Sequence, residues 1–555
     1  MFHKKARKDT SAVPPELRFR EDMKDLFLTG RLTGTQAHAT MKNAEAAGAG
    51  GVSQLARGNV SDRHSARDLL NRMQKNSKWP PLYYGKVRVW DIKTNEKTTV
   101  DLPFFLPHEL IHSIVHNDST IDLLAEAGLC AGAKQHLEFI KGQLGAEHCL
   151  ALGLWGDGVP CNWDRSESLE CVTLSFPGLV GEKEHMRVPL TCIKKKFCIK
   201  NETFDDIMTI ISWSLKAAAE NEFPTNRHDE SPFSAKEKFR IDQAGKKVGV
   251  PAGLVEVRGD WQFFKQIFRF PGWREKKGCC WRCKATPANI AQVGSNASWR
   301  RNRRSHIQLL QYMLEKGEGI SPIFSAPFVR ADIFQIDWLH CSDLGVAPDF
   351  AGNLLYLLLD KVPGATNNDK CGVLFKSMKE FYDRTPGCSR FDQLKPTMIK
   401  QPKKSPKLRG KAAEIRCIVP WLVEVAEQYL GDAGAEGAAK LAARELLECY
   451  KCLSSAAYSS DSMANHCKRY CLQLVALRAV SGEEKVWVLK PKLHLFQEMC
   501  EMSDSRPSSC WTYRDEDFGG TLAKLSRAEG GNDGPGVAPY RTLTKFSVGN
   551  ALPTV

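Results

Sequence analysis

The sequence lacks any apolar run long enough to cross a bilayer. Its most apolar stretch, Leu354–Leu359, ends at Asp360, whereas a spanning helix needs about 20 residues. The basic N-terminus is not followed by the apolar segment of a secretory signal peptide. We therefore expect no membrane partner.

Several motifs that mark large enzyme classes are also missing. The sequence has no P-loop, no Gly-x-Gly-x-x-Gly turn after a strand, no Gly-x-Ser-x-Gly elbow and no His-Glu-x-x-His pair. These absences weigh against kinases, dehydrogenases, hydrolases of the nucleophile-elbow type and zinc proteases.

Cysteine is too sparse for a disulfide-stabilised scaffold, with 19 residues in a chain of 555. The cysteines are spaced irregularly, and many lie singly on apolar stretches, where a free thiol behaves as a small buried hydrophobe. We expect a reducing intracellular compartment, and the nucleus is the location that the basic runs favour.

Positive charge is present in modest excess but is clustered. Lysine and arginine number 78 against 64 aspartates and glutamates, a net charge of +14. The basic runs are Lys4–Lys8, Arg300–Arg304 and Lys400–Lys411. Such runs suit a phosphate backbone, although a solvated surface or an import signal is the simpler interpretation. Trp299 stands directly before Arg300, Arg301, Arg303 and Arg304. An aromatic side chain beside cations can stack on a base while the cations hold phosphates. We therefore predict that these four arginines bind DNA.

The length predicts several domains. Changes in composition and periodicity divide the chain into a partly disordered basic N-terminal segment (1–80), a small strand-plus-helix region (81–148), an α/β core with a Cys-x-x-Cys insertion (149–345), a helical insertion (346–500), a closing helix of the core (501–530) and a flexible tail (531–555).

Three acids follow features that could place them at one site. The apolar run Cys149–Trp155 stops just before Asp157, Ile333–Ile336 stops at Asp337, and a helix expected to start near Asp515 carries Glu516. Carboxylates from separate elements can hold two divalent ions for phosphodiester chemistry, and Mg²⁺ prefers such oxygen ligands. Each acid also has an ordinary interpretation as a turn residue, a helix cap or a partner of a helix dipole, so spacing alone decides little.

The order of these motifs resembles that of the CACTA (En/Spm-type) transposases of plants, over roughly residues 150–345 and 485–525. The family's Asp-Gly-Phe-Asn-Pro is matched by Asp157–Asn162, and its Gly-Trp, basic stretch and Cys-x-x-Cys by residues 272–283. Its Asp-Val-Met-His is matched by Asp337–His340, its Pro-Lys-x-His-Leu by Pro491–Leu495, and its Trp-x-Tyr-Pro-Phe-Glu by Trp511–Glu516.

The resemblance implies a transposase that cleaves DNA and transfers strands with two Mg²⁺ or Mn²⁺ ions held by Asp157, Asp337 and Glu516. It implies an RNase H-like mixed sheet core with a long all-helical insertion before the last acidic helix. DNA is the implied partner, and a homo-oligomer is left open. His340 is expected to support Asp337 from outside the metal shell. The alternative is a catalytically inactive transposon-derived protein that binds DNA or serves as a scaffold.

The sequence departs from the family pattern near two of the three acids. Asp157 lacks the Asn-Pro that usually follows, and Arg514 and Asp515 stand where the family has Pro and Phe. Asp515 or Asp517 therefore competes with Glu516 for the third place, and Asp343 competes with Asp337 for the second.

Cys280 and Cys283 form a Cys-x-x-Cys pair, which is half of a structural zinc site. No second pair is evident. His306, Cys161 and His340 are the candidates for the missing ligands, and a buried cysteine knuckle without metal is the alternative.

Overall fold

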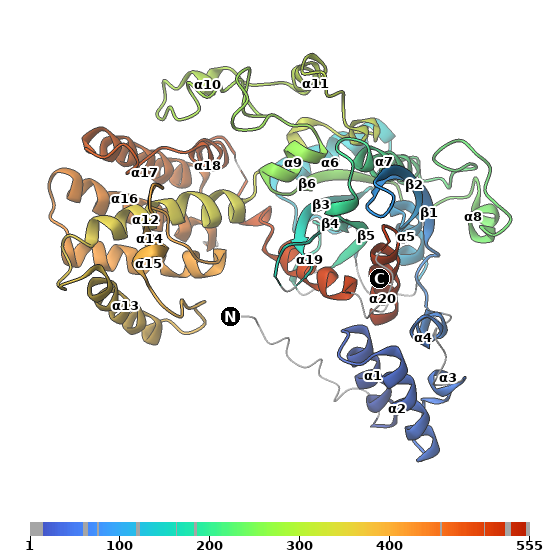
Figure 1. The fold of residues 1–555 in the computed structure, drawn as a ribbon. Coiled ribbons are helices and arrows are strands. Elements are labelled where there is room, and N and C mark those ends of the chain that lie inside the picture. Colours follow the sequence, from blue (N-terminus) through green and yellow to red (C-terminus); the bar gives the residue numbers. More distant parts are fainter. Residues whose placement is uncertain are drawn as a thin grey trace.

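The computed structural model describes residues 15–58, 65–74, 77–117, 122–162, 164–181, 186–454, 458–503, 505–527 and 534–550. The basic run Lys4–Lys8 lies outside these residues. The fold is a mixed α/β arrangement in which a small sheet is flanked by a bundle of helices on one side and by the N-terminal helices below (Figure 1).

The central sheet has four strands: β3 (Leu150–Pro160), β4 (Ser168–Ser175), β5 (Arg187–Lys194) and β6 (Ala252–Arg258). Their order is β5-β4-β3-β6; β3, β4 and β5 pair antiparallel, and β6 runs parallel to β3. Every residue of β5 and β6 is buried, including the charged Arg187, Lys194, Glu256 and Arg258. The four strands lie where the sequence predicts them.

The expected strand at 333–337 is reduced to a single contact. Phe334 forms one parallel bridge to Val257 of β6, and the Gln335 amide donates to the Val257 carbonyl at 2.9 Å. The segment therefore extends the sheet edge without becoming a full strand.

Two strands and three helices complete the central region. The hairpin β1 (Tyr83–Asp91) and β2 (Glu96–Phe104) turns at Asn95, whose φ of 58° is the left-handed conformation that asparagine tolerates. Around the sheet lie α5 (Pro107–Val115), α6 (Ala131–Leu144) and α7 (Thr203–Glu220). Short elements follow after α7: α8 (Lys238–Gln243), α9 (Trp261–Ile267), α10 (Ser298–Arg301) and α11 (His306–Glu315).

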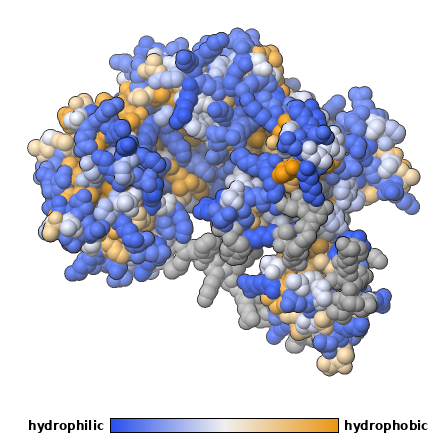
Figure 2. Space-filling model, viewed as in Figure 1, coloured by the Kyte–Doolittle hydropathy of each residue, from blue (hydrophilic) through white to orange (hydrophobic). Residues whose placement is uncertain are grey.

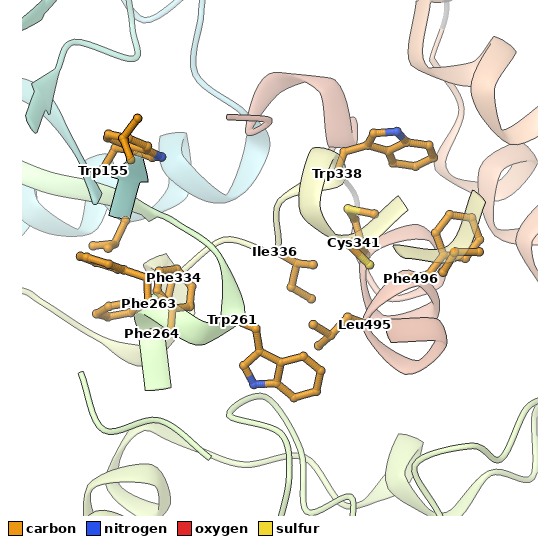
Figure 3. Close-up of a cluster of buried hydrophobic side chains, with 14 of the residues drawn as sticks. Trp155, Trp261, Phe263, Phe264, Phe334, Ile336, Trp338, Cys341, Leu495 and Phe496 are labelled. Carbon is orange, nitrogen blue, oxygen red and sulfur yellow. The ribbon is translucent and has the colours of Figure 1, made fainter. Parts of the chain in front are cut away.

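The region 346–500 is helical, as predicted. It contains α12 (Ala347–Leu358), α13 (Asn367–Arg384), α14 (Pro396–Ile399), α15 (Ala412–Tyr429), α16 (Gly434–Ser454), α17 (Ser460–Val480) and α18 (Pro491–Glu501). Buried apolar side chains run from Trp261 and Ile336 on the core side to Leu495 and Phe496 on α18 (Figure 3). A disulfide joins Cys388 to Cys417 of α15, and the remaining cysteines are free thiols.

The two ends of the chain are more ordered than the sequence predicts. The described part of residues 1–80 forms α1 (Pro15–Leu28), α2 (Gly34–Ala46), α3 (Ser53–Ala56) and α4 (Ser65–Gln74), which share a small apolar core with Val548 from the last helix. The last two helices are α19 (Tyr513–Ser526) and α20 (Val537–Gly549).

The prediction of a flexible tail over 531–555 is wrong for α20. Leu543 and Phe546 of this helix are buried, and the helix packs against β5, β2 and α4. The glycines and proline before this helix suggested a loop, so the helix with its buried apolar face was not predicted.

Among the described helices, none combines the length and apolarity that crossing a membrane would require. The face shown in Figure 2 is mostly hydrophilic, with hydrophobic residues scattered over it.

Candidate active site

Asp157 lies inside β3 rather than at its end. The strand continues to Pro160, and Asp157 pairs with Cys171 of β4. Its side chain is 17% exposed. Gly156 precedes it because a Cβ there would overlap the ring of Phe263, so the chain can carry no larger residue beside this acid.

Asp337 is buried, and both of its carboxylate oxygens accept hydrogen bonds. Oδ1 accepts from the amides of Leu339 (3.1 Å) and Thr512 (2.9 Å). Oδ2 accepts from the His340 amide (2.9 Å) and the Thr512 hydroxyl (2.8 Å) and contacts His340 Nδ1 at 2.7 Å. Asp337 therefore connects the start of a π-helical segment, Leu339–Val346, to the residue before α19.

His340 lies between the three predicted acids. Its Nδ1 contacts Asp337, and its Nε2 lies 3.8 Å from Asp157 Oδ2 and 3.8 Å from Glu516 Oε1. Burial opposes a charged ring, but the hydrogen bond to Asp337 and the charges of all three carboxylates outweigh it and raise the pKa of His340 to about 9. The imidazolium thus neutralises part of the negative charge.

Glu516 reaches this point from the first turn of α19, and its side chain is 31% exposed. Burial, followed by the charge of Asp157, raises the pKa of Glu516. Burial and the neighbouring charge of Asp260 raise the pKa of Asp157 to about 6. Such raised values are typical of carboxylates gathered at one site.

The donor atoms of Asp157, His340 and Glu516 lie within 4.8 Å of one another. The carboxylates of Asp157 and Glu516 are the oxygen ligands that Mg²⁺ or Mn²⁺ prefers, so these two residues fit such an ion, whereas His340 in its protonated form has no lone pair to offer it. The roles of Asp337 and His340 differ from the sequence-based expectation, in which Asp337 held the metal and His340 supported it. In the structure His340 faces Asp157 and Glu516 directly, and Asp337 orients the His340 ring through a hydrogen bond.

The three acids that competed for these places, Asp343, Asp515 and Asp517, do not join the site. Asp343 accepts hydrogen bonds from Trp338, Tyr450 and Tyr513, three donors that surround it in the interior. Asp515 is buried and bonds Arg187 at 2.7 Å and Arg258 at 3.4 Å. Asp517 is exposed. Of the acids on α19, Glu516 is the one that joins Asp157.

Asp260 is an additional acid that the sequence reasoning missed. It follows β6, the parallel neighbour of β3, and its Oδ1 caps α9 by accepting from the Phe263 amide at 2.5 Å. Its charge raises the pKa of Asp157, and it lines the same cavity as Asp337 and His340. An acid directly after a buried strand was the available signal.

The contact between α19 and β3 depends on a glycine. A Cβ at Gly519 would lie 2.7 Å from Val159 Cγ2 and 2.9 Å from the Trp155 ring, whereas one at Gly520 would meet nothing within 4 Å. We expect Gly519→Ala to lower the free energy of unfolding by about 1–3 kcal/mol, and Gly520→Ala to leave it unchanged or raise it by up to about 1 kcal/mol. Urea denaturation of both variants measures this; equal effects would contradict the tight packing of α19.

A second donor group contains the Cys-x-x-Cys pair. Cys280, Cys283, His494 and Glu498 are all buried, and their donor atoms lie within 4.8 Å of one another. Cys283 Sγ lies 3.4 Å from His494 Nε2, which lies 3.6 Å from Glu498 Oε1. Although burial opposes a thiolate, the contacts with Cys283 and His494 lower the pKa of Cys280 well below its usual value, which suits a soft metal ligand.

None of the ligands expected from the sequence completes this group. His306 packs on Phe324, Cys161 lies near Glu167, and His340 belongs to the acidic site. The other potential donors are His494 and Glu498, one helical turn apart on α18, in the segment that resembles Pro-Lys-x-His-Leu. Their spacing of four residues on a helix was a usable signal.

Three of the four arginines predicted to bind DNA make internal contacts. Arg300 pairs with Glu501 at 2.8 Å, Arg303 holds both oxygens of Glu498 at 2.6 and 2.7 Å, and Arg304 lies 4.5 Å from the centre of the Tyr312 ring. Arg301 is exposed. Arg300 and Arg303 therefore connect the segment that follows Cys280 and Cys283 to α18. Contact with DNA stays a prediction, and Arg301 is the arginine best placed to make it.

Comparison with protein-family models finds no match to the chain, and none of the curated proteins matches it.

Proposed function

We propose that the chain is a transposase-like protein that uses divalent metal ions to cleave DNA phosphodiesters and transfer strands. One observation carries the proposal: Asp157 of β3, Asp337 beside the sheet edge and Glu516 of α19 all contact the imidazole of His340.

The strand order supports an RNase H-like core. Three consecutive antiparallel strands are followed by a fourth that runs parallel beside the first, and the bridge at Phe334 occupies the place of a fifth. In this arrangement Asp157 lies on the first strand and Asp260 directly after the fourth. Fold alone does not decide function, so the acids carry the argument.

The side chains of the acidic site have different proposed roles. Asp157 and Glu516 would hold Mg²⁺ or Mn²⁺, with Asp260 beside them and His340 held in place by Asp337 and, through Asp337, by Thr512. When bound, two such ions supply the activation of water or a DNA 3′-hydroxyl and stabilise the leaving oxygen. His340, with a pKa of about 9, holds a proton within reach of both carboxylates and compensates their charge.

The cysteine group is proposed as a structural zinc site. Cys280, Cys283 and His494 are the soft and borderline ligands that Zn²⁺ prefers, and Glu498 adds a fourth donor, which Arg303 orients. This site would join the loop before α10 to α18.

Nicking of a supercoiled plasmid by the purified full chain tests the catalytic proposal. We expect relaxed circles in Mg²⁺ or Mn²⁺ and none in EDTA. DNA that is bound but never nicked under any of these conditions would favour the alternative of a catalytically inactive DNA-binding or scaffold protein.

A further inference from the structure

A cavity of about 310 Å³ lies beside the acidic site, between the sheet edge and the helical insertion. The core contributes residues 259–262, 335–337, 340 and 341, and the helical region contributes Asp349, Lys407 and the start of α18. Asp337 and His340 form part of the same wall, so whatever enters this cavity lies next to the acids. Figure 3 shows Trp261, Ile336 and Leu495 gathered at the junction of the two parts.

One side of the cavity is aromatic. Trp261 and the half-buried Trp273 pack edge to face with centroids 5.6 Å apart, and Trp281 lies 6.0 Å from Trp261. The indole N–H of Trp261 donates to the Pro271 carbonyl at 2.9 Å, which fixes the ring. Gln262 and Gln335 also line the space, and amide side chains can pair with the edges of bases.

The opposite side carries three lysines but few acids. Lys490 pairs with Asp349 at 2.6 Å, Lys407 lies 3.9 Å from the same carboxylate, and Lys492 donates to the His340 carbonyl at 2.5 Å. Asp349 thus lies beside two of the three ammonium groups, and the other two aspartates of the cavity, Asp260 and Asp337, belong to the wall on the core side. Lys407 also belongs to the basic run Lys400–Lys411, of which Lys403, Lys404 and Arg409 are exposed.

Resting on the proposed function, we propose that this cavity holds one unpaired nucleotide of the DNA strand being cleaved, with its base against Trp261 and Trp273 and its phosphates along the lysines. The volume is at the lower end for ligand pockets and suits a single nucleotide, whereas a stacked base pair is too large. The base must therefore leave the helix before it enters.

Photo-crosslinking tests the occupant directly. The probe is a single strand of roughly 12 nucleotides in which every base is 5-iodouracil, added to the full chain without Mg²⁺ or Mn²⁺, so that cleavage plays no part and the proposed zinc site stays intact. After irradiation, we expect mass spectrometry to find the crosslink on Trp261 or Trp273. A blunt duplex carrying the same bases should give much less of it. Crosslinks that map only elsewhere, or equal yields from the duplex, would overturn the proposal.

Substitutions supply the second arm. Trp273→Leu and Trp261→Leu should each weaken binding of the strand about tenfold, measured by fluorescence anisotropy, whereas Trp90→Leu on β1 should not. Lys490→Gln should lower the slope of log affinity against log salt by about 0.7, while Lys376→Gln on α13 should leave it unchanged. Because Trp273 is half-buried, its variant remains informative if Trp261→Leu fails to fold. Unchanged affinity in both Trp273→Leu and Lys490→Gln would refute the site.

The two proposals fail separately. Asp157→Asn should lose nicking but keep the crosslink. A wild-type chain that crosslinks at the tryptophans yet never nicks DNA would refute the catalytic proposal alone. Nicking without such a crosslink would refute the nucleotide pocket alone.

Discussion

Replacing Asp157 with Asn, or Glu516 with Gln, is expected to lower metal-dependent nicking by at least about 100-fold. Each substitution keeps the shape of the side chain but removes the charge that would hold a divalent ion. The fold should not suffer, because burial raises the pKa of both carboxyl groups and the substitution removes one buried negative charge. Plasmid nicking rates and thermal denaturation of the same preparations measure both effects.

Asp517→Asn is the matched control, because it changes an exposed acid on the same helix one residue from Glu516. Its nicking rate should stay within about twofold of the wild type. If Asp157→Asn or Glu516→Gln retained a comparable rate, the acidic site would not be the catalytic one.

Asp260→Asn distinguishes two arrangements of the same site. If Asp260 belongs to the metal-holding set, its loss should reduce nicking as strongly as that of Asp157. If it serves only to cap α9 through the Phe263 amide, the variant should lose about 1 kcal/mol of stability and keep most of its activity.

Purified protein is expected to contain close to one zinc per chain, and Cys280→Ser or Cys283→Ser to contain almost none. A structural zinc site is worth roughly 10 kcal/mol of binding free energy, and this one joins two segments separated by most of the insertion. We therefore expect the variants to melt at least about 5 °C lower than the wild type. Elemental analysis and differential scanning calorimetry give the two readouts.

Cys279→Ser is the control for the zinc prediction. Cys279 is buried beside the pair, but its thiol contacts the Ala285 carbonyl and it is not one of the four converging donors. Its zinc content should match that of the wild type. Wild-type protein that carries well under one equivalent of zinc would contradict the site.

The sheet and the insertion were predictable because their patterns are local. β4 and β5 are buried runs of about eight residues, and the insertion keeps helical periodicity between its breaks. The acids were predicted by resemblance, and Asp157 and Glu516 do meet. The role of Asp337 was not predictable, because its oxygens are occupied by Thr512, a partner far along the chain.

The remaining differences have the same cause. The arginines after Trp299 look like a nucleic-acid contact until Glu498 and Glu501 are known to lie beneath them. The proposed zinc ligands His494 and Glu498 lie on α18, far along the chain from Cys280. A count of charges or cysteines along the chain records which groups are present, but not which distant groups neutralise them.

The distance along the chain between β3 and α19 also sets when the site can exist. Asp157 leaves the ribosome early, whereas Glu516 and the Thr512 that orders Asp337 follow only after the whole insertion has been translated, on the order of tens of seconds later. A chain that ends before α19 lacks Glu516 and Thr512 and so has only one wall of the proposed site. The helical region therefore separates the synthesis of the first acid from that of the last.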